Sequence, residues 1–453
     1  EDLAANMWVN EAELNGTPGV DDDGNGYVDD VYGYNFSMNE PQISWNKLRV
    51  SDGRTGDQGH GTHVAGVVAA VNNNNVGISG IAGGSGKGDG VRIMSCQIYS
   101  GGQNCTEEYL AKAIRYAADN GASILQCSWG FQAGAVLSDK SYKTRQPLVY
   151  AAIEYFENAD RKELGFDNPI NGGVAFFAAG NDGKEMSAYP GALADIISVT
   201  AFASDYKPTG YTNYGPGCNI AAPGGEFYYT SSDGNTYLCD GCVLSTMPEG
   251  YIYSTDYDGK GYGYMQGTSM ACPHVSGIAA LILARYGGQG YTPDALRKRL
   301  EESVTDISAQ NAGYYLGKGL VNAYKAVAGS GGVAPEMPTG LSVSTQSNNI
   351  KFSVAVPEDA DDGKPSAICI YYSKTNFTST KNVMFGMFYV ENQKVGEVLS
   401  GSISGAEFNT EYYVAAQAVD LAGNKSALTE RVKVSTGGNN APVIKALSPV
   451  EFT

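Results

Sequence analysis

Three short segments of the chain carry residue types suited to acyl-transfer chemistry. The histidines all lie in two of them: His60 and His63 stand in a Gly-His-Gly-Thr-His run, and His274 follows a Gly-Thr-Ser run that contains Ser269. The third segment is a Gly-Asn-Asp-Gly turn around Asn181. A serine nucleophile, a histidine base and an amide that stabilises an oxyanion are the parts that such a site needs.

The surroundings of these residues favour that chemistry over a passive role. Ser269 opens an apolar stretch, residues 270–283, which is typical of a buried helix. Its hydroxyl would then lie at the positive end of a helix dipole, beside free backbone N–H groups. His60 opens a second apolar helix, and Asn181 directly follows a buried strand. A helix cap or a loop residue explains any one of these motifs, but it does not explain all three in this order.

Across residues 1–328 the chain resembles the subtilisin-like serine proteases, the subtilases, because the three motifs match that family nearly residue for residue. The resemblance implies that Ser269 is the nucleophile and His60 the general base. It also implies that Asn181 donates its side-chain amide to the oxyanion, with the backbone N–H of Ser269 as the second donor. His63 and His274 match structural positions, so we expect them to pack and orient the two helices.

The same resemblance indicates where a protein or peptide substrate would bind. Residues 127–130 match the strand that pairs with an extended peptide, an arrangement in which backbone bonds give affinity and pockets give selectivity. The expected substrate-binding residues are Ser128, Trp129, Gly130, Ala178, Ala179 and Gly180. The small residues among them predict a roomy apolar pocket for the residue before the scissile bond. Asp182 near the mouth of this pocket would admit a basic side chain.

The elements expected to hold these residues alternate between strands and helices. Buried parallel strands are expected at residues 91–98, 123–127, 173–179 and 196–200. Helices are expected at residues 106–119, with a Thr N-cap, and at 293–304, after a Thr-Pro pair. This alternation predicts an α/β fold, and the resemblance makes it a three-layer subtilisin-like domain with a parallel sheet between helices.

The composition changes after residue 328. Residues 329–338 are typical of a linker. Residues 339–436 contain alternating strands separated by turn residues, and this segment resembles a fibronectin type III domain, an all-β sandwich of the immunoglobulin-like kind. We expect it to be an accessory module. Residues 437–453 are expected to contain a second linker and the start of a further domain.

Length and charge exclude several classes of function. The chain has 453 residues, too many for one ordinary domain, and 42% of them are hydrophobic, which suffices for sizeable cores. Asp and Glu total 48 against 30 Lys and Arg, and the net charge of −18 argues against binding of nucleic acid or anionic membranes. No apolar run reaches about 18 residues, so no transmembrane segment is expected. An acidic chain rich in Gly and Tyr is typical of secreted proteins, and we expect an extracellular or cell-surface location.

An acidic loop predicts a calcium site. Counting from Asp21, oxygen-bearing side chains occupy positions 1, 3, 5 and 9, a backbone carbonyl occupies position 7, and a Gly at position 6 permits a sharp turn. The expected ligands are Asp21, Asp23, Asn25, the carbonyl of Tyr27, and Asp29. This is the front half of an EF-hand loop, but position 12 is Tyr32 rather than the bidentate Glu. The alternative is a solvated acidic turn.

A second, weaker calcium site is suggested by the family resemblance alone. Residues 71–78 match a loop that interrupts the helix after His60 and wraps a calcium ion in many subtilases. The ligands expected from this match are Asp2, Val71, Asn73, Val76 and Ile78. The loop is one residue longer than its common form, which leaves open the Asn that points inward.

The eight cysteines are too sparse for a disulfide scaffold. Cys272 inside the helix of the nucleophile and Cys369 in the sandwich are expected to be buried free thiols. Cys239 and Cys242 form one Cys-x-x-Cys pair, which supplies too few ligands for a zinc site. They are either joined to each other, or linked to Cys218, or free.

The third member of a subtilase triad is missing from the sequence. Subtilases carry the triad in the order Asp, His, Ser, and no Asp-Thr-Gly or Asp-Ser-Gly turn precedes His60. The family match places that Asp about eight residues before Glu1. The acids of residues 21–30 belong to the expected metal loop and are poor substitutes. Without the strand that carries the Asp, the sheet would contain a large apolar slot.

We therefore expect a shorter N-terminal polypeptide, which carries the Asp strand, to remain bound without a covalent link and to complete the site. The alternative is that these residues are simply absent, which leaves an inactive domain. The leading function is a secreted serine endopeptidase. The competing functions are an inactive subtilase-like binding or scaffold protein that acts through its β-sandwich, and a pseudoenzyme. Labelling of Ser269 by a fluorophosphonate probe would separate the enzyme from both.

Overall fold

The computed structural model describes residues 2–43, 59–100, 105–230, 236–238, 241–248, 261–288, 290–328, 333–360, 363–390, 393–420 and 423–438. The chain divides into two compact units, Glu1–Val327 and Ala328–Thr453. Parts of the sequence-based predictions fall outside the described residues, namely Cys239, the centre of the linker at 329–332, and the tail from residue 439.

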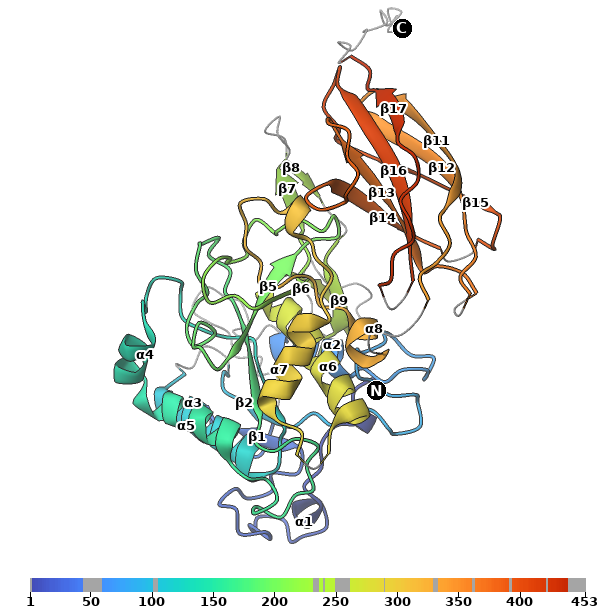
Figure 1. Cartoon of the computed structure of the whole chain (residues 1–453). Helices are drawn as coiled ribbons and strands as arrows, with labels where there is room; N and C mark the ends of the chain where they lie inside the picture. The colour runs from blue at the N-terminus through green and yellow to red at the C-terminus, as the bar shows by residue number, and fades with distance from the viewer. Residues whose placement is uncertain are drawn as a thin grey trace, which may run out of the picture. The chain divides into compact units, whose positions relative to one another are not determined.

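A four-stranded parallel sheet forms the centre of the first unit (Figure 1). Its strands stand in the order β3 (Ile124–Cys127), β4 (Val174–Ala178), β5 (Ile197–Phe202) and β6 (Ile220–Pro223). β4 and β5 are buried along their whole length, as apolar strands covered on both faces should be. The strands predicted at 123–127, 173–179 and 196–200 are therefore confirmed.

The strand predicted at residues 91–98 is shorter than expected and does not join this sheet. It contains β2 (Ser95–Gln97), which pairs in parallel with β1 (Gly33–Asn35). Among the described residues, β2 and β3 do not pair with each other. The single parallel sheet expected from the sequence is therefore interrupted between these two strands.

Helices cover both faces of the sheet, as the alternating pattern predicts. Because successive side chains of a strand point to opposite faces, Ala175 and Phe177 of β4 pack with α3 (Glu107–Asp119) and α5 (Pro147–Asn158). Their neighbour Phe176 packs on the other face.

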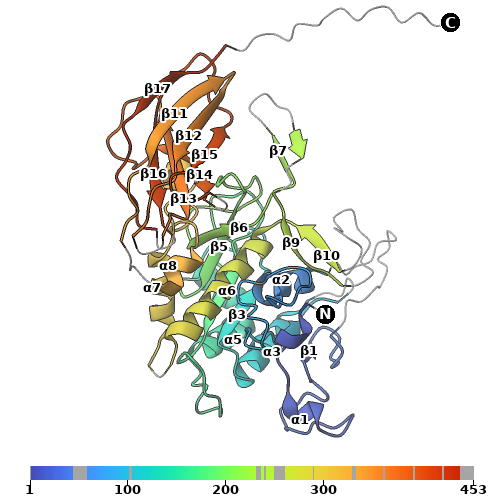
Figure 2. The same ribbon diagram turned by 90° about the vertical axis from the view of Figure 1, so that its right-hand side faces the viewer.

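That second face is covered by α6 (Thr268–Tyr286) and α7 (Pro293–Glu302), and α2 (His60–Ala69) lies beside α6 (Figure 2). The predicted starts of α3 and α7 are confirmed. Thr106 accepts the backbone N–H of Tyr109, and Thr292 accepts that of Ala295, so both threonines are N-caps.

The remaining elements of the first unit are short. The helical ones are η1 (Ala4–Asn6), α1 (Glu11–Leu14), α4 (Asp139–Arg145), η2 (Ser308–Gln310) and α8 (Ala323–Ala328). Two antiparallel pairs join β7 (Tyr228–Thr230) to β8 (Thr236–Leu238) and β9 (Val243–Thr246) to β10 (Tyr262–Met265). In the described part of the chain, no helix is long and apolar enough to cross a membrane.

The second unit is an antiparallel β-sandwich of a three-stranded and a four-stranded sheet. The first sheet has the order β11 (Thr339–Gln346), β12 (Asn349–Ala355), β15 (Val398–Ile403). The second has the order β14 (Met384–Tyr389), β13 (Ala367–Ser373), β16 (Glu411–Val419), β17 (Val432–Ser435). The rings of Phe352 and Phe388 meet in the core between the sheets, with centroids 4.4 Å apart. The predicted all-β sandwich is present.

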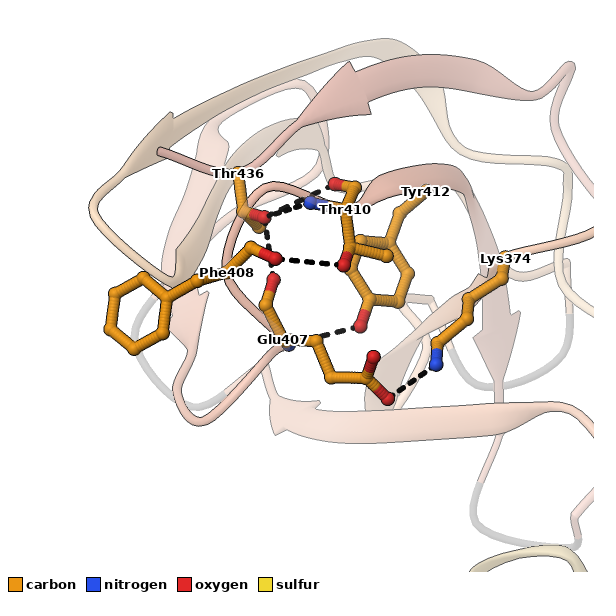
Figure 3. A network of polar contacts seen from close by, with 6 residues as sticks. All are labelled: Lys374, Glu407, Phe408, Thr410, Tyr412 and Thr436. Carbon is orange, nitrogen blue, oxygen red and sulfur yellow. Dashed lines mark hydrogen bonds and ion pairs between the residues drawn. The ribbon is translucent and has the colours of Figure 1, made fainter. Parts of the chain in front are cut away.

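A polar network fixes one end of this sandwich (Figure 3). The hydroxyl of the buried Tyr412 in β16 accepts the backbone N–H of Glu407 at 3.0 Å. Thr436, which follows β17, donates its hydroxyl to the carbonyl of Glu407 at 2.6 Å. A tyrosine near the start of the sixth strand that bonds a few residues upstream is the tyrosine corner of immunoglobulin-like sandwiches.

Candidate active site

Ser269 lies in the first turn of α6, where backbone N–H groups lack helical acceptors. The N-cap is Gly267, whose φ of 147° is a conformation that favours glycine. The side chain of Ser269 is nearly buried, with 9% exposed. The helix begins two residues before the predicted apolar stretch, so the serine stands inside the positive end of the helix rather than ahead of it.

Asn181, in the turn after β4, lies against this end of α6. Its Oδ1 accepts the backbone N–H of Thr268 at 2.9 Å and the hydroxyl of Thr268 at 2.8 Å. Because the amide oxygen is held in this way, the Nδ2 group is left to point elsewhere. A methyl group placed on Gly267 would lie 3.5 Å from the backbone N of Ser269 and 3.6 Å from Asn181 Nδ2. Two N–H donors therefore border one small space beside the nucleophile, which glycine keeps open.

Thr268 is a site residue that the sequence analysis missed. Besides donating to Asn181, its hydroxyl accepts the backbone N–H of Gly180 at 3.2 Å, so it fastens the turn after β4 to the start of α6. A hydroxyl-bearing residue directly before the candidate nucleophile was the signal available in the sequence.

Ser128 connects β3 to the nucleophile through two hydrogen bonds. Its hydroxyl donates to the carbonyl of Ser269 at 2.7 Å, and its own carbonyl accepts the Ser269 hydroxyl at 3.3 Å. The first bond is available because Pro273, four residues after Ser269, has no N–H to give to that carbonyl. In this arrangement the nucleophilic hydroxyl is bonded to Ser128 and not to a base.

His60 is the first residue of α2, after Gly59 in a left-handed conformation. Burial lowers the pKa of His60 from its ordinary value of 6.5. Within the described ranges, no side chain forms a hydrogen bond or an ion pair with this imidazole. The structure therefore supplies a neutral base but no group that orients it.

A slot with a volume of about 1160 Å³ adjoins His60. It is lined by residues 93–99, which include β2, and by residues 121–126, which include most of β3. Residues of α2, of α6 and of several loops, among them residues 89–92, also line it. Both strands present an edge that is unpaired in the described structure, so the slot has the walls of a missing parallel strand. Such a slot was expected from the sequence.

A smaller pocket of about 220 Å³ lies on the other side of Ser128, beside the nucleophile. Five of the six expected substrate-binding residues line it: Ser128, Trp129, Gly130, Ala178 and Gly180. The sixth, Ala179, is fully buried and does not line it. Asp182 lines the pocket as well, but its carboxylate accepts the backbone N–H of Ala133 at 2.9 Å.

The other two histidines lie within the packing of α2 and α6. The Nε2 of His63 lies 3.0 Å from the carbonyl of Val243, and burial lowers the pKa of this fully buried histidine to about 4. The Nδ1 of His274 lies 2.8 Å from the carbonyl of Met270, one turn earlier in α6. Neither contact involves the nucleophile, which is what packing roles require.

In the acidic loop, the structure gathers a different set of oxygens from the one expected. Carboxylate oxygens of Glu13, Asp23 and Asp30 lie within 4.8 Å of one another. Asp21 instead accepts the backbone N–H groups of Asn25 and Gly26, at 3.1 and 2.9 Å.

Two further expected ligands are also engaged elsewhere. The carboxylate of Asp29 accepts the backbone N–H of Gly19, and the Oδ1 of Asn25 accepts the backbone N–H of Tyr27 at 2.7 Å. Only Asp23 is thus common to both sets. Glu13 belongs to α1 and lies outside the loop motif, so the sequence pattern of the loop could not identify it as a member of the carboxylate cluster.

Around the second loop, Asp2 is nearly buried and meets residues 71–78. Its carboxylate accepts the side-chain amide of Asn74 at 2.7 Å and the backbone N–H of Ile78 at 3.1 Å, and Val71 donates its N–H to the Asp2 carbonyl. The side chain of Asn73 turns instead to the carbonyl of Ser85, at 3.4 Å. Val76 donates its N–H to Asn74. Asn74 is therefore the residue of this loop whose side chain faces Asp2.

Six of the seven cysteines in the described residues are free thiols: Cys96, Cys105, Cys127, Cys218, Cys272 and Cys369. The expected burial of Cys272 and Cys369 is confirmed, and burial raises the pKa of Cys369 to about 11. A link between Cys218 and Cys242 is absent. Whether Cys242 pairs with Cys239 lies outside the described residues.

Comparison with known proteins agrees with this geometry. A model of the subtilase family matches residues 18–319. Thermitase of Thermoactinomyces vulgaris is 31% identical over 269 residues, which are 59% of this chain and 75% of that protein. A thermophilic serine proteinase of Bacillus sp. (strain AK1) is 30% identical over 268 residues, 59% of this chain and 52% of that protein.

Subtilisin-like protease 1 of Plasmodium berghei (strain Anka) is 29% identical over 316 residues, which are 68% of this chain and 44% of that protein. The chain thus spans three quarters of the first relative and about half or less of the other two. The family match covers most of the chain and includes His60, Asn181 and Ser269. The chain therefore belongs to the subtilase family of serine proteases.

Proposed function

We propose that this chain is a serine endopeptidase in which Ser269 attacks the peptide carbonyl, His60 takes the proton from its hydroxyl, and Asn181 stabilises the oxyanion. The observation that carries the proposal is the space at Gly267, which the backbone N–H of Ser269 and the Nδ2 of Asn181 border together. Donors fixed in advance stabilise a developing oxyanion without reorganisation, and this is usually the largest single contribution to such catalysis.

The hydroxyl of Ser269 must change partner for this reaction. It now donates to the carbonyl of Ser128, and it has to donate to His60 when it attacks. His60 then passes the proton to the leaving amine, and a water molecule releases the acyl group by the same steps in reverse.

The substrate in this proposal is an extended peptide that lies along residues 128–130. The residue before the scissile bond enters the 220 Å³ pocket, whose small and apolar walls favour an apolar side chain. The Asp182 carboxylate accepts the N–H of Ala133 and the side-chain amide of Asn213 through Oδ2, so a basic side chain in this pocket would pair with Oδ1.

The proposed mechanism also requires a carboxylate beside His60. A strand that binds in the slot would place one there. We assign the slot to a strand that runs parallel to β2 and β3, pairs with both edges and carries an Asp at its carboxyl end, since the slot is lined both by His60 and by residues 98 and 128 at the carboxyl ends of these strands. Such a carboxylate holds the base in the correct tautomer and stabilises its charged form. The companion N-terminal polypeptide expected from the sequence would supply this strand.

A fluorophosphonate probe tests the proposal directly. Labelling of the folded protein at Ser269, located by peptide mass spectrometry and absent from a Ser269→Ala variant, supports the peptidase. Folded protein that stays unlabelled supports an inert binding or scaffold protein instead. Intact-mass spectra in denaturing and native conditions then test the companion. A second polypeptide that appears beside the 47.7 kDa chain supports it, and a single species that still labels excludes a separate companion.

Three further assignments complete the proposal. Calcium at Glu13, Asp23 and Asp30 would be structural, because a set of carboxylate oxygens, two of them on buried residues, suits a hard cation. The sandwich would be of the fibronectin type III kind, which its three and four strands and its tyrosine corner support. An extracellular location rests on the acidic, Gly- and Tyr-rich composition, and detection of the protein in culture medium would test it.

A further inference from the structure

The hairpin formed by β9 and β10 connects the helix of His60 to the helix of Ser269. β9 packs against α2 (Figure 2), and its antiparallel register with β10 places Val243 opposite Met265. β10 ends at Met265, and Ser269 is the fourth residue after it, so the chain passes from the hairpin directly into the first turn of α6. One strand of the hairpin therefore contacts the helix of the proposed base, and the other leads into the helix of the proposed nucleophile.

Two hydroxyl groups of β9 form hydrogen bonds with the first turn of α2. Ser245 donates its hydroxyl to the carbonyl of His63 at 2.7 Å, and Thr246 donates its hydroxyl to the carbonyl of Thr62 at 2.8 Å. Each carbonyl has two lone pairs, so it accepts a hydroxyl in addition to its helical N–H. Ser245 is fully buried and Thr246 is nearly so, which protects both bonds from competition by water.

Two glycines allow this close approach of β9 to α2. A methyl group placed on Gly66 would lie 2.3 Å from the hydroxyl oxygen of Thr246 and 2.4 Å from that of Ser245. A methyl group placed on Gly59, directly before His60, would lie 2.5 Å from the ring of Pro248, which follows β9. These distances leave no room for a side chain. The hairpin therefore fits against α2 on both sides of His60 along the chain.

The place of His60 depends on these contacts, because the described side chains offer its imidazole no hydrogen bond. The backbone of α2 alone then determines where the ring lies. A general base must lie within about 2.6–3.2 Å of the group whose proton it takes, and a displacement of about 1 Å can cost roughly 10²-fold in rate. The bonded carbonyls of Thr62 and His63 lie within three residues of His60, where they limit such a displacement.

We propose that Thr246 and Ser245 are positioning residues: their hydroxyls hold the first turn of α2, and with it His60, at a fixed place relative to Ser269. This inference rests on the proposed function and goes beyond it, because it assigns the alignment of base and nucleophile to hydroxyls that bond neither of them. A carboxylate in the slot would orient the ring of His60, whereas the hairpin fixes the backbone that carries the ring.

The test is a pair of substitutions in the active protein, Thr246→Val and Thr246→Ser. Val keeps the shape of Thr and lacks the hydroxyl, so kcat for a peptide substrate should fall about tenfold while KM changes less than about twofold. Ser keeps the hydroxyl, so Thr246→Ser should keep kcat within about threefold of the wild type. Equal losses of kcat in both variants would overturn the inference, as would a kcat of Thr246→Val within about twofold of the wild type.

Thr200 in β5 offers a matched control. It is fully buried, and its hydroxyl donates to the backbone carbonyls of Ile220 and Leu316, at 3.3 and 3.0 Å. Thr200→Val therefore makes the same chemical change outside the hairpin. Both variants lose a buried hydrogen bond and should lose stability, but only Thr246→Val should lose kcat. A fall in kcat of equal size in both variants would show a general loss of structure and would overturn the inference.

A double-mutant cycle with His60→Ala shows whether Thr246 acts through the base. The substrate is an activated nitrophenyl ester, which is less dependent on a base than a peptide is. The variant with both His60→Ala and Thr246→Val should react no more slowly than His60→Ala alone, because the residue that Thr246 positions is already gone. Additive losses would overturn the inference.

Two further outcomes are separated by the same measurements. If Thr246→Val does not fold, Ser245→Ala removes the neighbouring bond to His63 and gives the same cycle. A wild type that fluorophosphonate does not label would defeat the proposed function itself. A labelled wild type with unaffected Thr246 and Ser245 variants would defeat this inference alone.

Discussion

The two halves of the active site differ in how far the described chain completes them. The nucleophile half is built: Asn181 is held by Thr268, Ser269 by Ser128, and both oxyanion donors border the space at Gly267. The base half is not, because His60 is only partly buried beside an open slot and has no hydrogen-bond or ion-pair partner among the described side chains.

The difference reflects where the constraints come from. The nucleophile half depends on a helix end, a glycine and a proline that lie within seven residues of one another, from Gly267 to Pro273, together with the ends of β3 and β4. In the proposed mechanism the base half depends on a strand between β2 and β3, which no described residue provides. A peptidase built in this way keeps its oxyanion donors in place whether or not the base is ready.

The largest expected effect comes from removing the nucleophile. Ser269→Ala should lower kcat for a peptide substrate by roughly 10⁶-fold, because no other group can form the acyl intermediate. Turnover of a chromogenic peptide measures this loss. A variant that keeps even one hundredth of the wild-type rate would show that the activity resides elsewhere.

A smaller effect is expected at the oxyanion donor. Asn181→Ala removes Nδ2 and leaves the backbone N–H of Ser269 as a single donor, so kcat should fall by roughly 10²- to 10³-fold with little change in KM. Thr268→Val is the companion variant: it keeps Asn181 but removes the hydroxyl that holds it, and its loss should be smaller. Equal losses of kcat in both variants would mean that Asn181 stabilises the oxyanion only when the hydroxyl of Thr268 holds its side chain in place.

The pH dependence of fluorophosphonate labelling reports whether a carboxylate lies beside His60. Burial alone lowers the pKa of His60, so an unpaired base would stay neutral to below pH 6.5. A carboxylate in the slot favours the charged form and should raise that pKa again. The rate of fluorophosphonate labelling should therefore decline as the pH falls through the raised pKa, at a higher pH than for an unpaired base. An inflection well below 6.5 would indicate that His60 works without a carboxylate partner.

The sequence predicted the parts with local signals and missed those that depend on distant contacts. The starts of α3 and α7 followed from Thr106 and Thr292, and the buried strands followed from their apolar runs. Thr268 was not identified, because its contacts with Gly180 and Asn181 appear only when the end of β4 meets the start of α6. The interruption of the sheet between β2 and β3 has no local signal in the apolar run at 91–98, and the slot there was expected only from the family resemblance and the missing Asp strand.

The acidic loop differs from the base half, because its three clustered carboxylates already accept hydrogen bonds from described N–H and O–H groups, some of which calcium would have to replace. Calcium at about one hundred times its dissociation constant would stabilise the fold by about 2.7 kcal/mol. We expect calcium to raise the thermal midpoint, and Asp23→Asn to reduce the rise by removing charge from the cluster of Glu13, Asp23 and Asp30. Asp205→Asn, at an exposed acid paired with Lys207, is the control and should leave the rise unchanged. No shift of the wild-type midpoint with a chelator would rule out calcium here.

The smallest expected effect lies in the sandwich. In contrast to His60, the side chain of Tyr412 has a hydrogen-bond partner within its own unit, the backbone N–H of Glu407. Tyr412→Phe removes the hydroxyl that accepts the N–H of Glu407, and the sandwich should lose about 1 kcal/mol of stability. Lys374→Ala breaks only an exposed ion pair with Glu407, which water and salt screen, so it should cost less stability than Tyr412→Phe.

Cys369 makes this measurable in the whole protein, because it is the single cysteine of the second unit and is almost completely buried. Its rate of alkylation, followed by peptide mass spectrometry, rises with the fraction of sandwich that opens. A loss of about 1 kcal/mol should raise that rate about fivefold in Tyr412→Phe while peptidase activity stays constant. If activity fell with the opening of the sandwich, the second unit would be part of the catalytic machinery, and the contrast would no longer lie only between the two halves of the site.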